Sequence, residues 1–449
     1  MKIRLIQPAQ LDDSGKPIKY KKILLPSGTL STIAALTPND VEVSITNEYI
    51  DTIDFSEDLD IVGITALTCH APRAYQIAQE FKKRGKTVVM GGIHATALPQ
   101  EALQHVDSVV VGEAENLWEK VVRDFQKNNK LNSIYKNDVF PDLKKLVIPR
   151  FDLNNSDKCL KAPFAKTPAM PIFTTRGCPF SCSYCSVTKF FGGKYRTKPI
   201  DNVLREIDAS KARDFFFVDD NLAANSKYSE QLFKEITPLK IRWFSQFSTR
   251  VLNNPKLVEL AGESGCHEVI LGIESLNICN LKSVNKSFNK PEEYARLFKL
   301  LKSNGISPHV MIMFGLENDD VELLKRTLEF LLDNDVNFIR IFTVTPYPGT
   351  DLYQKLDCEG RIFEKDWSKY DLNHIVFSPK NISIQDLQDN VWKSYYTFYS
   401  YKNIIKRLWK FKKFYLTPDK KGSLLDDLLF QLHFHIATGK RLDPWSGVN

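Results

Sequence analysis

Residues 174–185 read Thr-Thr-Arg-Gly-Cys-Pro-Phe-Ser-Cys-Ser-Tyr-Cys, which places Cys178, Cys182 and Cys185 at C-x3-C-x2-C spacing. A short apolar run at 171–174 precedes them, so the cysteines are predicted to lie on a loop that leaves a strand. Closed structural metal sites take four protein ligands, and iron–sulfur clusters are held by cysteine thiolates. A set of three thiolates therefore predicts a metal centre with one open position.

This spacing leaves a zinc site open as an alternative, with Cys159, Cys266, Cys279 or Cys358 as the fourth ligand. Zinc ligands usually come in paired short spacings, and the chain contains no second C-x2-C and no H-x3-H set. An electron-transfer ferredoxin is disfavoured, because it would need a fourth thiolate nearby and a far shorter chain.

The composition is that of an ordinary globular protein of two to four domains, with 449 residues, 43% hydrophobic and 26% charged. The N-terminus, Met1–Pro8, reads as a strand that turns polar too quickly for a signal peptide. No apolar run approaches the length of about 18 residues that spans a bilayer. Eight thinly spread cysteines favour a reducing compartment, so we expect a cytoplasmic protein. The net charge of +7 is modest and does not call for nucleic acid.

Residues 1–130 alternate strand and helix patterns. Strands are predicted at Ile3–Gln7, Val41–Thr46, Ile61–Leu67, Thr87–Met90 and Ser108–Val111, where short β-branched runs occur. A helical pattern at 72–84 has proline at its start and Gly85 after its end. This alternation predicts a doubly wound, Rossmann-like parallel sheet, whose ligand site lies beyond the carboxyl ends of its strands.

The turns after three of these strands carry groups that suit a bound ligand. They read Thr-Ala-Leu-Thr-Cys-His at 65–70, Gly-Gly-Ile-His at 91–94 and Gly-Glu-Ala-Glu at 112–115. Glycine lets a ligand approach the backbone closely, and threonine hydroxyls can bind amides or phosphate. No G-x-G-x-x-G fingerprint is present, so a nicotinamide dinucleotide is disfavoured.

The periodicity fades over residues 131–168, which we interpret as a surface linker. Residues 169–355 then repeat strand and helix six times, which predicts a partial (β/α)6 barrel with catalytic groups at the carboxyl ends of the strands. The predicted strands are Pro171–Thr174, Phe215–Val218, Trp243–Ser248, Glu268–Gly272, Val310–Phe314 and Phe338–Val344. A C-terminal, mostly helical segment at 356–449 follows.

The cysteine spacing, the aromatic Tyr184 before the last cysteine and the lead-in Thr-Arg-Gly-Cys-Pro resemble the radical S-adenosylmethionine (SAM) enzymes. The resemblance implies that Cys178, Cys182 and Cys185 hold a [4Fe–4S] cluster. The fourth iron of such a cluster chelates SAM and cleaves it reductively to a 5′-deoxyadenosyl radical. An external electron donor of the flavodoxin or ferredoxin type is implied as a partner.

The resemblance also implies that SAM lies across the top of the barrel. Polar or small residues stand at the corresponding strand ends, where carboxylates, amides and hydroxyls could bind its ammonium, ribose and adenine groups. The predicted SAM-binding residues are Tyr184, Asp219, Asp220, Gln246, Ser248, Glu274 and Gly315. Taken singly, a strand-end aspartate is as often a helix cap.

The N-terminal turns resemble the cobalamin-binding domain that precedes many radical SAM domains, in the class B type of methyltransferase. The predicted cobalamin-binding residues are Thr65, Thr68, Gly91, Gly92, His94, Gly112 and Glu113. The chain lacks the D-x-H-x-x-G motif, so cobalamin is expected to bind without a motif histidine below the cobalt. A docking domain without the cofactor is the alternative.

The C-terminal segment combines aromatic and basic residues. Between Lys402 and Arg441 the chain has ten Lys or Arg against three Asp, a net charge of +7. Apolar residues recur at helical spacing, namely Trp392, Tyr395, Tyr396, Tyr399, Ile404, Ile405, Leu408 and Trp409, with Lys406, Arg407, Lys410, Lys412 and Lys413 between them. Such a stripe packs a terminal helix onto a barrel, or lies on an anionic membrane surface.

We therefore expect a cytoplasmic, cobalamin-associated radical SAM enzyme that methylates an unactivated carbon of a small-molecule or lipid-like substrate. An unactivated C–H offers no acidic proton to a side-chain base, so a cofactor must supply the reactivity. The alternative within the family is a radical cyclisation, rearrangement or carbon–carbon coupling without methyl transfer. The alternative outside it is a non-catalytic regulator that binds metal or cobalamin.

Overall fold

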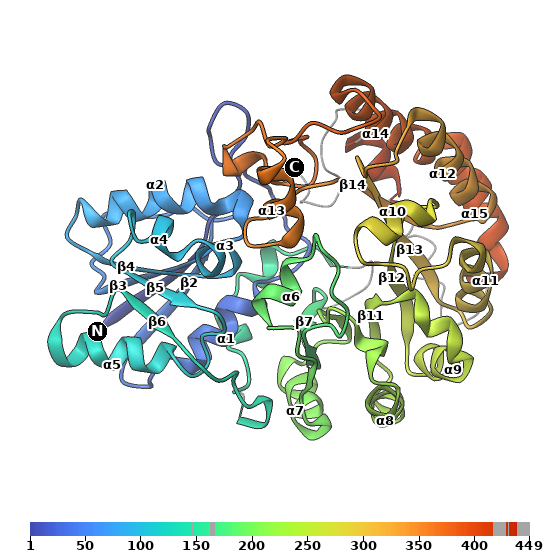
Figure 1. The fold of residues 1–449 in the computed structure, drawn as a ribbon. Coiled ribbons are helices and arrows are strands. Elements are labelled where there is room, and N and C mark those ends of the chain that lie inside the picture. Colours follow the sequence, from blue (N-terminus) through green and yellow to red (C-terminus); the bar gives the residue numbers. More distant parts are fainter. Residues whose placement is uncertain (146, 162–166, 416–427, 430, 438–449) are drawn as a thin grey trace.

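The computed structural model describes residues 1–449 except 146, 162–166, 416–427, 430 and 438–449. Two parallel β-sheets, each with its own helices, lie side by side and are joined through the region of the cysteine loop (Figure 1). The predicted α/β class, with a doubly wound N-terminal domain followed by a partial barrel, is confirmed.

The N-terminal sheet has six parallel strands in the order β2-β1-β3-β4-β5-β6. Its strands are β1 (Lys2–Gln7), β2 (Glu42–Asn47), β3 (Ile61–Thr65), β4 (Thr87–Gly91), β5 (Ser108–Val111) and β6 (Ile134–Lys136). The first five coincide with the predicted strands to within two residues at each end. β6 lies inside the predicted linker, because three residues at a sheet edge are too few to show a period.

Helices cover both faces of this sheet (Figure 1). They are α1 (Gly28–Leu36), α2 (Ala71–Lys82), α3 (Ile93–Ala97), α4 (Pro99–Ala102) and α5 (Trp118–Asn128). α2 packs in one apolar core, while α1 and α5 pack in a second core on the other face. Burial on both faces explains why the central strands are almost wholly apolar rather than alternating.

The second sheet is also parallel, in the order β7-β10-β11-β12-β13-β14. Its strands are β7 (Met170–Ile172), β10 (Asp214–Phe217), β11 (Arg242–Phe247), β12 (Cys266–Glu274), β13 (Ser307–Phe314) and β14 (Phe338–Thr343). These are the six predicted strands. A small antiparallel hairpin of β8 (Thr175–Arg176) and β9 (Arg196–Thr197) stands apart from the sheet.

An arc of helices surrounds this sheet (Figure 1). The larger ones are α7 (Ile200–Ser210), α8 (Ser226–Ile236), α9 (Pro255–Glu263), α11 (Tyr294–Ser303), α12 (Val321–Asp333), α14 (Ile384–Phe398) and α15 (Tyr401–Tyr415). Shorter ones are α6 (Ser186–Phe190), α10 (Ile278–Ser283) and α13 (Asp351–Cys358). One large apolar core joins strands and helices, with Trp243 and Phe298 among its fully buried side chains.

The two open edges of the partial barrel are covered by different parts of the chain. At one edge, α1 of the N-terminal domain contacts β7, and a side chain at Gly28 would meet the ring of Pro171. At the other edge, the Tyr395 hydroxyl donates to Ile341 O (3.0 Å) and accepts from Ile341 N (2.7 Å). The Tyr399 hydroxyl makes the same pair of bonds to Ile339 (2.9 and 3.0 Å).

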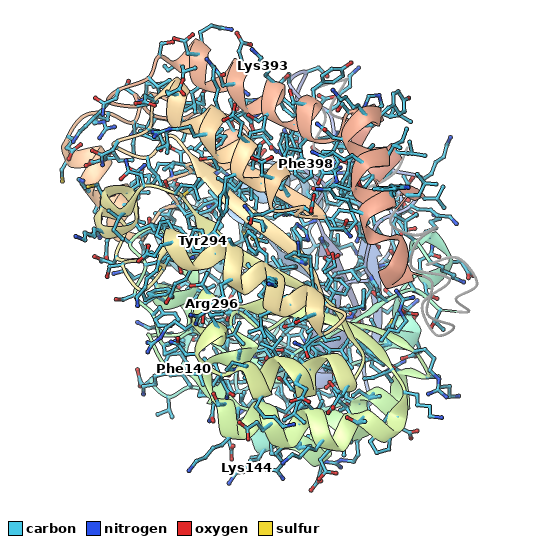
Figure 2. The ribbon with its side chains drawn as sticks, turned by 90° about the vertical axis from the view of Figure 1, so that its right-hand side faces the viewer. Phe140, Lys144, Tyr294, Arg296, Lys393 and Phe398 are labelled. Carbon is cyan, nitrogen blue, oxygen red and sulfur yellow. The ribbon has the colours of Figure 1, made fainter. Side chains whose placement is uncertain are left out.

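The C-terminal stripe therefore divides into two parts. Tyr395, Tyr399 and Ile404 are buried, as the packing alternative predicts, and α14 and α15 lie on the outside of the barrel (Figure 2). Tyr396, Ile405 and Trp409 are exposed instead. The side chains of Lys412 and Lys413 lie outside the described residues. In the part of the chain that the structure describes, no helix is long and apolar enough to cross a membrane.

Candidate active site

The cysteine loop is the excursion between β8 and β9, at the end of the barrel where the parallel strands finish. Cys178, Cys182 and Cys185 are partly buried and line one cavity of about 290 Å³. The carboxyl ends of β10, β11, β12, β13 and β14 contribute much of the remaining wall. The three thiols thus stand where a barrel of this type collects its functional groups.

Gly177 explains why the loop can leave β8 so sharply. Its φ of 84° is in the left-handed region, and a Cβ would overlap the carbonyl oxygen of Lys194, two residues before β9. Its N–H donates to Asp220 Oδ2 (3.0 Å), and Asn221 Nδ2 lies 3.9 Å from the sulfur of Cys178. The residues after β10 therefore hold the start of the loop.

A buried charged group faces the cysteines across the cavity. Lys286 Nζ donates to Glu274 Oε1 (2.6 Å) and to the Tyr184 hydroxyl (3.1 Å), and Tyr184 donates to the same carboxylate oxygen (3.0 Å). Glu274 adopts a φ of 62°, and Gly272 lacks the side chain that would collide with Glu274 and Lys286. Sequence reasoning missed Lys286, because a lysine in a loop belongs to no motif.

Burial and this ion pair set the electrostatics of the site. Burial raises the pKa of Cys185 to about 11 and also raises the pKa of Cys178 and Cys182. Burial opposes the charge of Lys286, but Glu274 and Cys182 outweigh it and raise the pKa of Lys286. A lysine kept cationic beside the thiols favours their thiolate form, which is the form that binds iron.

Most of the predicted SAM-binding residues meet at this cavity. Tyr184, Asp220, Gln246, Ser248 and Glu274 all line it. Burial raises the pKa of Asp220 to about 6. Acceptors and donors from three strand ends and the cysteine loop thus line one space, which suits a ligand that carries an ammonium group, a carboxylate and hydroxyls.

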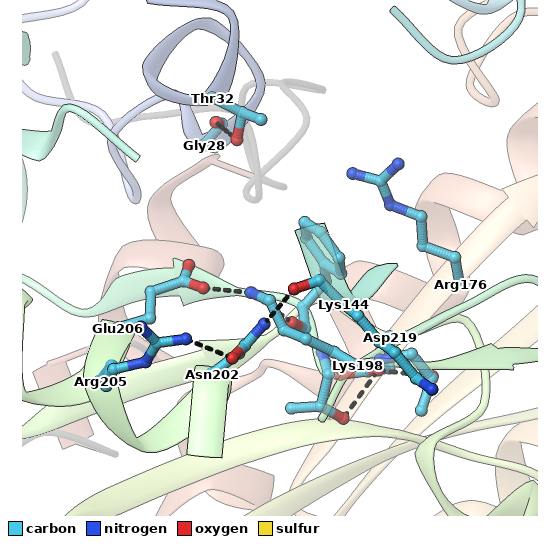
Figure 3. A network of polar contacts seen from close by, with 12 residues as sticks. Gly28, Thr32, Lys144, Arg176, Lys198, Asn202, Arg205, Glu206 and Asp219 are labelled. Carbon is cyan, nitrogen blue, oxygen red and sulfur yellow. Dashed lines mark hydrogen bonds and ion pairs between the residues drawn. The ribbon is translucent and has the colours of Figure 1, made fainter. Parts of the chain in front are cut away.

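Asp219 and Gly315, the other two residues of that set, do not line the cavity. Asp219 is fully buried and accepts bonds from both N–H groups and both hydroxyls of Thr174 and Thr175, so it braces the chain before the cysteine loop (Figure 3). A side chain at Gly315 would meet Leu387 of α14, and the backbone N–H of Gly315 donates to Asp319. We assign both residues to the support of the site rather than to its wall.

The donor set fits the expected cluster. Three thiols share one wall of the cavity, and among the described residues no other cysteine lines it. Cys266 opens β12 at the opposite end of the strand, and Cys159 pairs with the segment at Ile23. In the described ranges no three His, Cys, Asp or Glu side chains are placed to hold a single metal ion. The residues present therefore suit a cluster with three protein ligands.

The predicted cobalamin-binding turns come together in the N-terminal domain. Thr65 ends β3, Gly91 ends β4, and Gly112 follows β5, so the three turns lie at neighbouring strand ends of one sheet edge. Thr68 is buried at the start of a short turn after β3. Gly112 has a φ of 81° with nothing within 4 Å of a Cβ position, which leaves this turn open to a ligand.

Two residues of that set have other partners. His94 is fully buried, with Nε2 2.9 Å from the Tyr75 hydroxyl and 3.2 Å from Glu101 Oε1. Trp367 of the C-terminal segment donates to the same Glu101 oxygen (3.0 Å). Glu113 is buried in ion pairs with Arg176 and Arg196. His94, through Glu101, and Glu113 therefore both take part in contacts between the domains. Their positions at strand ends did not predict these contacts.

The radical SAM superfamily model matches residues 172–357, and the B12 binding domain model matches residues 26–122. The bacteriochlorophyllide d C-12(1)-methyltransferase of Chlorobaculum tepidum is 33% identical over 88% of this chain and 88% of its own length. The chain belongs to the cobalamin-binding radical SAM methyltransferases. The C-8(2)-methyltransferase of the same organism is likewise 33% identical, over 90% of this chain and 91% of its own.

The fold agrees with solved members of this methyltransferase family. A structure of TsrM from Kitasatospora setae with cobalamin and a [4Fe–4S] cluster superposes with a TM-score of 0.62, at 14% identity, over 80% of this chain and 75% of that one. The present methyltransferase is therefore an enzyme whose cofactors are a [4Fe–4S] cluster, SAM and cobalamin. A non-catalytic regulator and a zinc protein are excluded by this membership.

When bound in the methyltransferase, these cofactors supply radical chemistry and a transferable methyl group. The chain's own part is to bind, to orient and to exclude water. Cys178, Cys182 and Cys185 would hold the cluster, and Asp220, Glu274, Gln246 and Ser248 would hold SAM. Apolar side chains such as Phe247, Met311 and Met313 also line the cavity, and excluding water from it strengthens the polar contacts inside.

Gly112→Asn is expected to weaken cobalamin binding at least about tenfold while the cluster stays intact. Asparagine tolerates the left-handed backbone, so the new side chain mainly fills the open space at the turn. Gly85→Asn is the matched control. Gly85 also has a left-handed backbone and free space at its Cβ position, but it precedes β4 and so lies at the amino end of the strand, away from the predicted cobalamin turns. Titration of aquacobalamin into both variants checks this. Equal affinities would remove Gly112 from the cobalamin site.

Gly92, unlike Gly112, has no space for a side chain. A Cβ on Gly92 would lie 2.8 Å from Ala66 O and 2.9 Å from Ala66 N, and its φ is 97°. A side chain there would push two strand-end turns apart, so its main effect would be on the stability of the N-terminal domain. Gly92 serves the packing of the turn.

Proposed function

We propose that this enzyme transfers a methyl group to an unactivated carbon of an apolar small molecule held in the cavity above the barrel. The observation that carries the proposal is the mixed lining of the cavity. Beside the three cysteines it contains the charged groups of Asp220, Glu274 and Lys286. Its apolar lining comes from Ile270, Phe247, Met311, Met313 and Phe342.

An apolar wall suits a substrate that presents C–H bonds rather than acidic protons. A side-chain base gains nothing at such a carbon, and burial against methionine and phenylalanine keeps water away from a reactive centre. Methionine also adapts to an irregular ligand surface, because its side chain is unbranched and polarisable. These features support a lipid-like or planar apolar substrate.

One part of the cavity wall lies beside a contact with the N-terminal domain. This part includes Tyr347 after β14 and Leu372 beyond α13. Burial raises the pKa of Tyr347, and the neighbouring Cys69 and Asp371 raise it further. Gln10 of the N-terminal domain donates to Asp371 (3.0 Å). A substrate held between these walls would lie between the two cofactor domains.

Methyl transfer is tested with anaerobically reconstituted protein, a flavodoxin-type or chemical reductant, and SAM carrying a CD3 group. The names of the Chlorobaculum relatives make bacteriochlorophyllides the first substrates to try. We expect a product that gains one CD3 in place of hydrogen. A product that has lost hydrogen without gaining the label would favour cyclisation, rearrangement or coupling instead.

We further propose that α15 brings the enzyme to an anionic membrane surface. Tyr401, Ile405 and Trp409 are 57%, 67% and 67% exposed and recur every four residues, so they form one apolar ridge along the helix. Lys402, Lys406 and Lys410 follow each of them by one residue and form a parallel, exposed basic ridge. Aromatic and basic ridges side by side are typical of helices that lie in a bilayer interface.

Removing the basic ridge is expected to lower binding to anionic vesicles, since each lysine near the surface contributes about 1 kcal/mol. The variant is Lys402→Gln/Lys406→Gln/Lys410→Gln, with Trp409→Ser as a second one. Arg407 is left unchanged, because it is buried and donates to Gln431 and Phe398 O. Co-sedimentation with phosphatidylserine vesicles at low salt gives the bound fraction.

The matched control removes three exposed lysines from the other end of the molecule, Lys227, Lys234 and Lys240, at α8 and the turn after it. This control should bind vesicles like the wild type. If wild type and the α15 variants stay equally in the supernatant, the helix has no part in membrane contact, and the substrate proposal stands apart from it.

A further inference from the structure

Four charged side chains meet where the hairpin of the cysteine loop rests on the N-terminal domain. Arg176 Nη1 lies 2.5 Å from Glu113 Oε1, and Arg176 also pairs with Glu115. Arg196 Nη2 lies 2.7 Å from Glu113 Oε2. The side chains are 3% to 17% exposed, so the network is largely withdrawn from solvent.

The two arginines are direct partners across the hairpin. In the register of β8 and β9, Arg176 stands opposite Arg196. Like charges in this position destabilise a strand pair, and burial strengthens their repulsion. Glu113 binds one arginine with each carboxylate oxygen, so the hairpin gains its neutralising charge from the other domain. With Glu115, two positive and two negative charges balance.

Both cofactor sites are within two residues of this network. Glu113 follows Gly112, the open turn at the cobalamin face. Arg176 precedes Gly177 and the first ligand, Cys178. Arg196 is held again by Pro141 O (3.1 Å) and by the ring of Phe140, 4.8 Å from its guanidinium carbon. The segment between the domains thus braces the same hairpin.

We propose that Glu113 is a positioning residue that couples the two cofactor sites, and not a cobalamin contact. Its carboxylate neutralises Arg176 and Arg196 at the start and end of the cysteine loop. It thereby holds this loop against the turn at Gly112. The proposal rests on the proposed use of both cofactors. Because each site contributes to one shared element, we expect that filling either favours filling the other, and linked binding makes the two effects equal.

Glu113→Gln is the first test, because it keeps the shape of the side chain and leaves one buried arginine without its counter-charge. We expect the iron and acid-labile sulfide per chain after reconstitution to fall at least about twofold. The matched control is Glu48→Gln. Glu48 is equally buried and pairs with Arg73 (2.6 Å), but it follows β2 at the far edge of the sheet from β5.

A second variant separates charge balance from general damage to the fold. Glu113→Gln/Arg196→Gln restores neutrality, so it should recover part of the lost iron and sulfide, whereas a merely structural defect would deepen with a second change. Circular dichroism verifies the fold of each variant. Full cluster content in Glu113→Gln, or a double variant below the single one, would overturn the proposal.

The coupling itself is measured as the affinity for aquacobalamin of wild-type protein with and without its cluster. We expect the cluster to tighten binding about fivefold or more, and Glu113→Gln to remove this difference. A wild type that binds both cofactors with no mutual effect would overturn the coupling alone. A wild type that takes up neither cofactor would instead contradict the proposed function.

Discussion

Single replacement of Cys178, Cys182 or Cys185 by alanine is expected to abolish the iron–sulfur absorbance at roughly 400 nm after anaerobic reconstitution. The three thiols form one wall of the cavity, and among the described residues no other cysteine lines it. A cluster that loses one of three protein ligands has no substitute to recruit. Reductive cleavage of SAM should disappear with the absorbance, because the chain offers no other iron-binding cysteine set of this kind.

Cys279→Ser and Cys358→Ser serve as controls for this experiment. Both cysteines are exposed, on α10 and α13, and their loss should leave iron and sulfide content unchanged. A full cluster retained in all three alanine variants would contradict the assignment of the ligands.

Gly177→Ala is expected to be almost as damaging, although it removes no ligand. The left-handed backbone at this position costs alanine about 1 kcal/mol, and the new Cβ would overlap the main-chain carbonyl of Lys194. A backbone atom cannot swing aside as a flexible side chain can. The hairpin must therefore open, which moves the loop of the three cysteines. We expect a loss of cluster content of about tenfold, measured as iron per chain.

Gly193→Ala is the matched control within the same loop. Gly193 also has a positive φ, of 66°, but nothing lies within 4 Å of its Cβ position. The Gly193→Ala variant should therefore be destabilised only by backbone strain, and it should keep its cluster. Equal iron contents in the two variants would mean that the overlap at Gly177 is relieved without moving the cysteines.

Much of the fold follows from patterns of apolar residues. The strands β1, β3, β4, β5 and β10 to β14 are short β-branched or aromatic runs separated by helical stretches, and this order alone predicts parallel sheets. The same reasoning places functional groups at the strand ends, which is where Asp220, Gln246 and Glu274 line the cavity.

The apolar patterns could not predict which way a side chain points at a strand end. Successive residues there point to opposite sides, so of Asp219 and Asp220 only one can face the cavity. Contacts between distant segments were also hidden. Lys286 reaches Glu274 from a loop, and Glu113 reaches Arg176 from another domain, without any periodic signal in the sequence.

The two tyrosines of α14 and its C-terminal end that bind β14 limit where this chain can be truncated. A strand at a sheet edge presents free N–H and C=O groups, which act as a template for a strand of another molecule. Here Tyr395 and Tyr399 occupy those groups at Ile341 and Ile339. A version truncated before α14 would keep every cofactor residue named above. It would nevertheless expose the unpaired backbone N–H and C=O groups of β14, which favour aggregation. The barrel therefore needs α14 to protect its edge strand, and we expect a version without the C-terminal helices to aggregate.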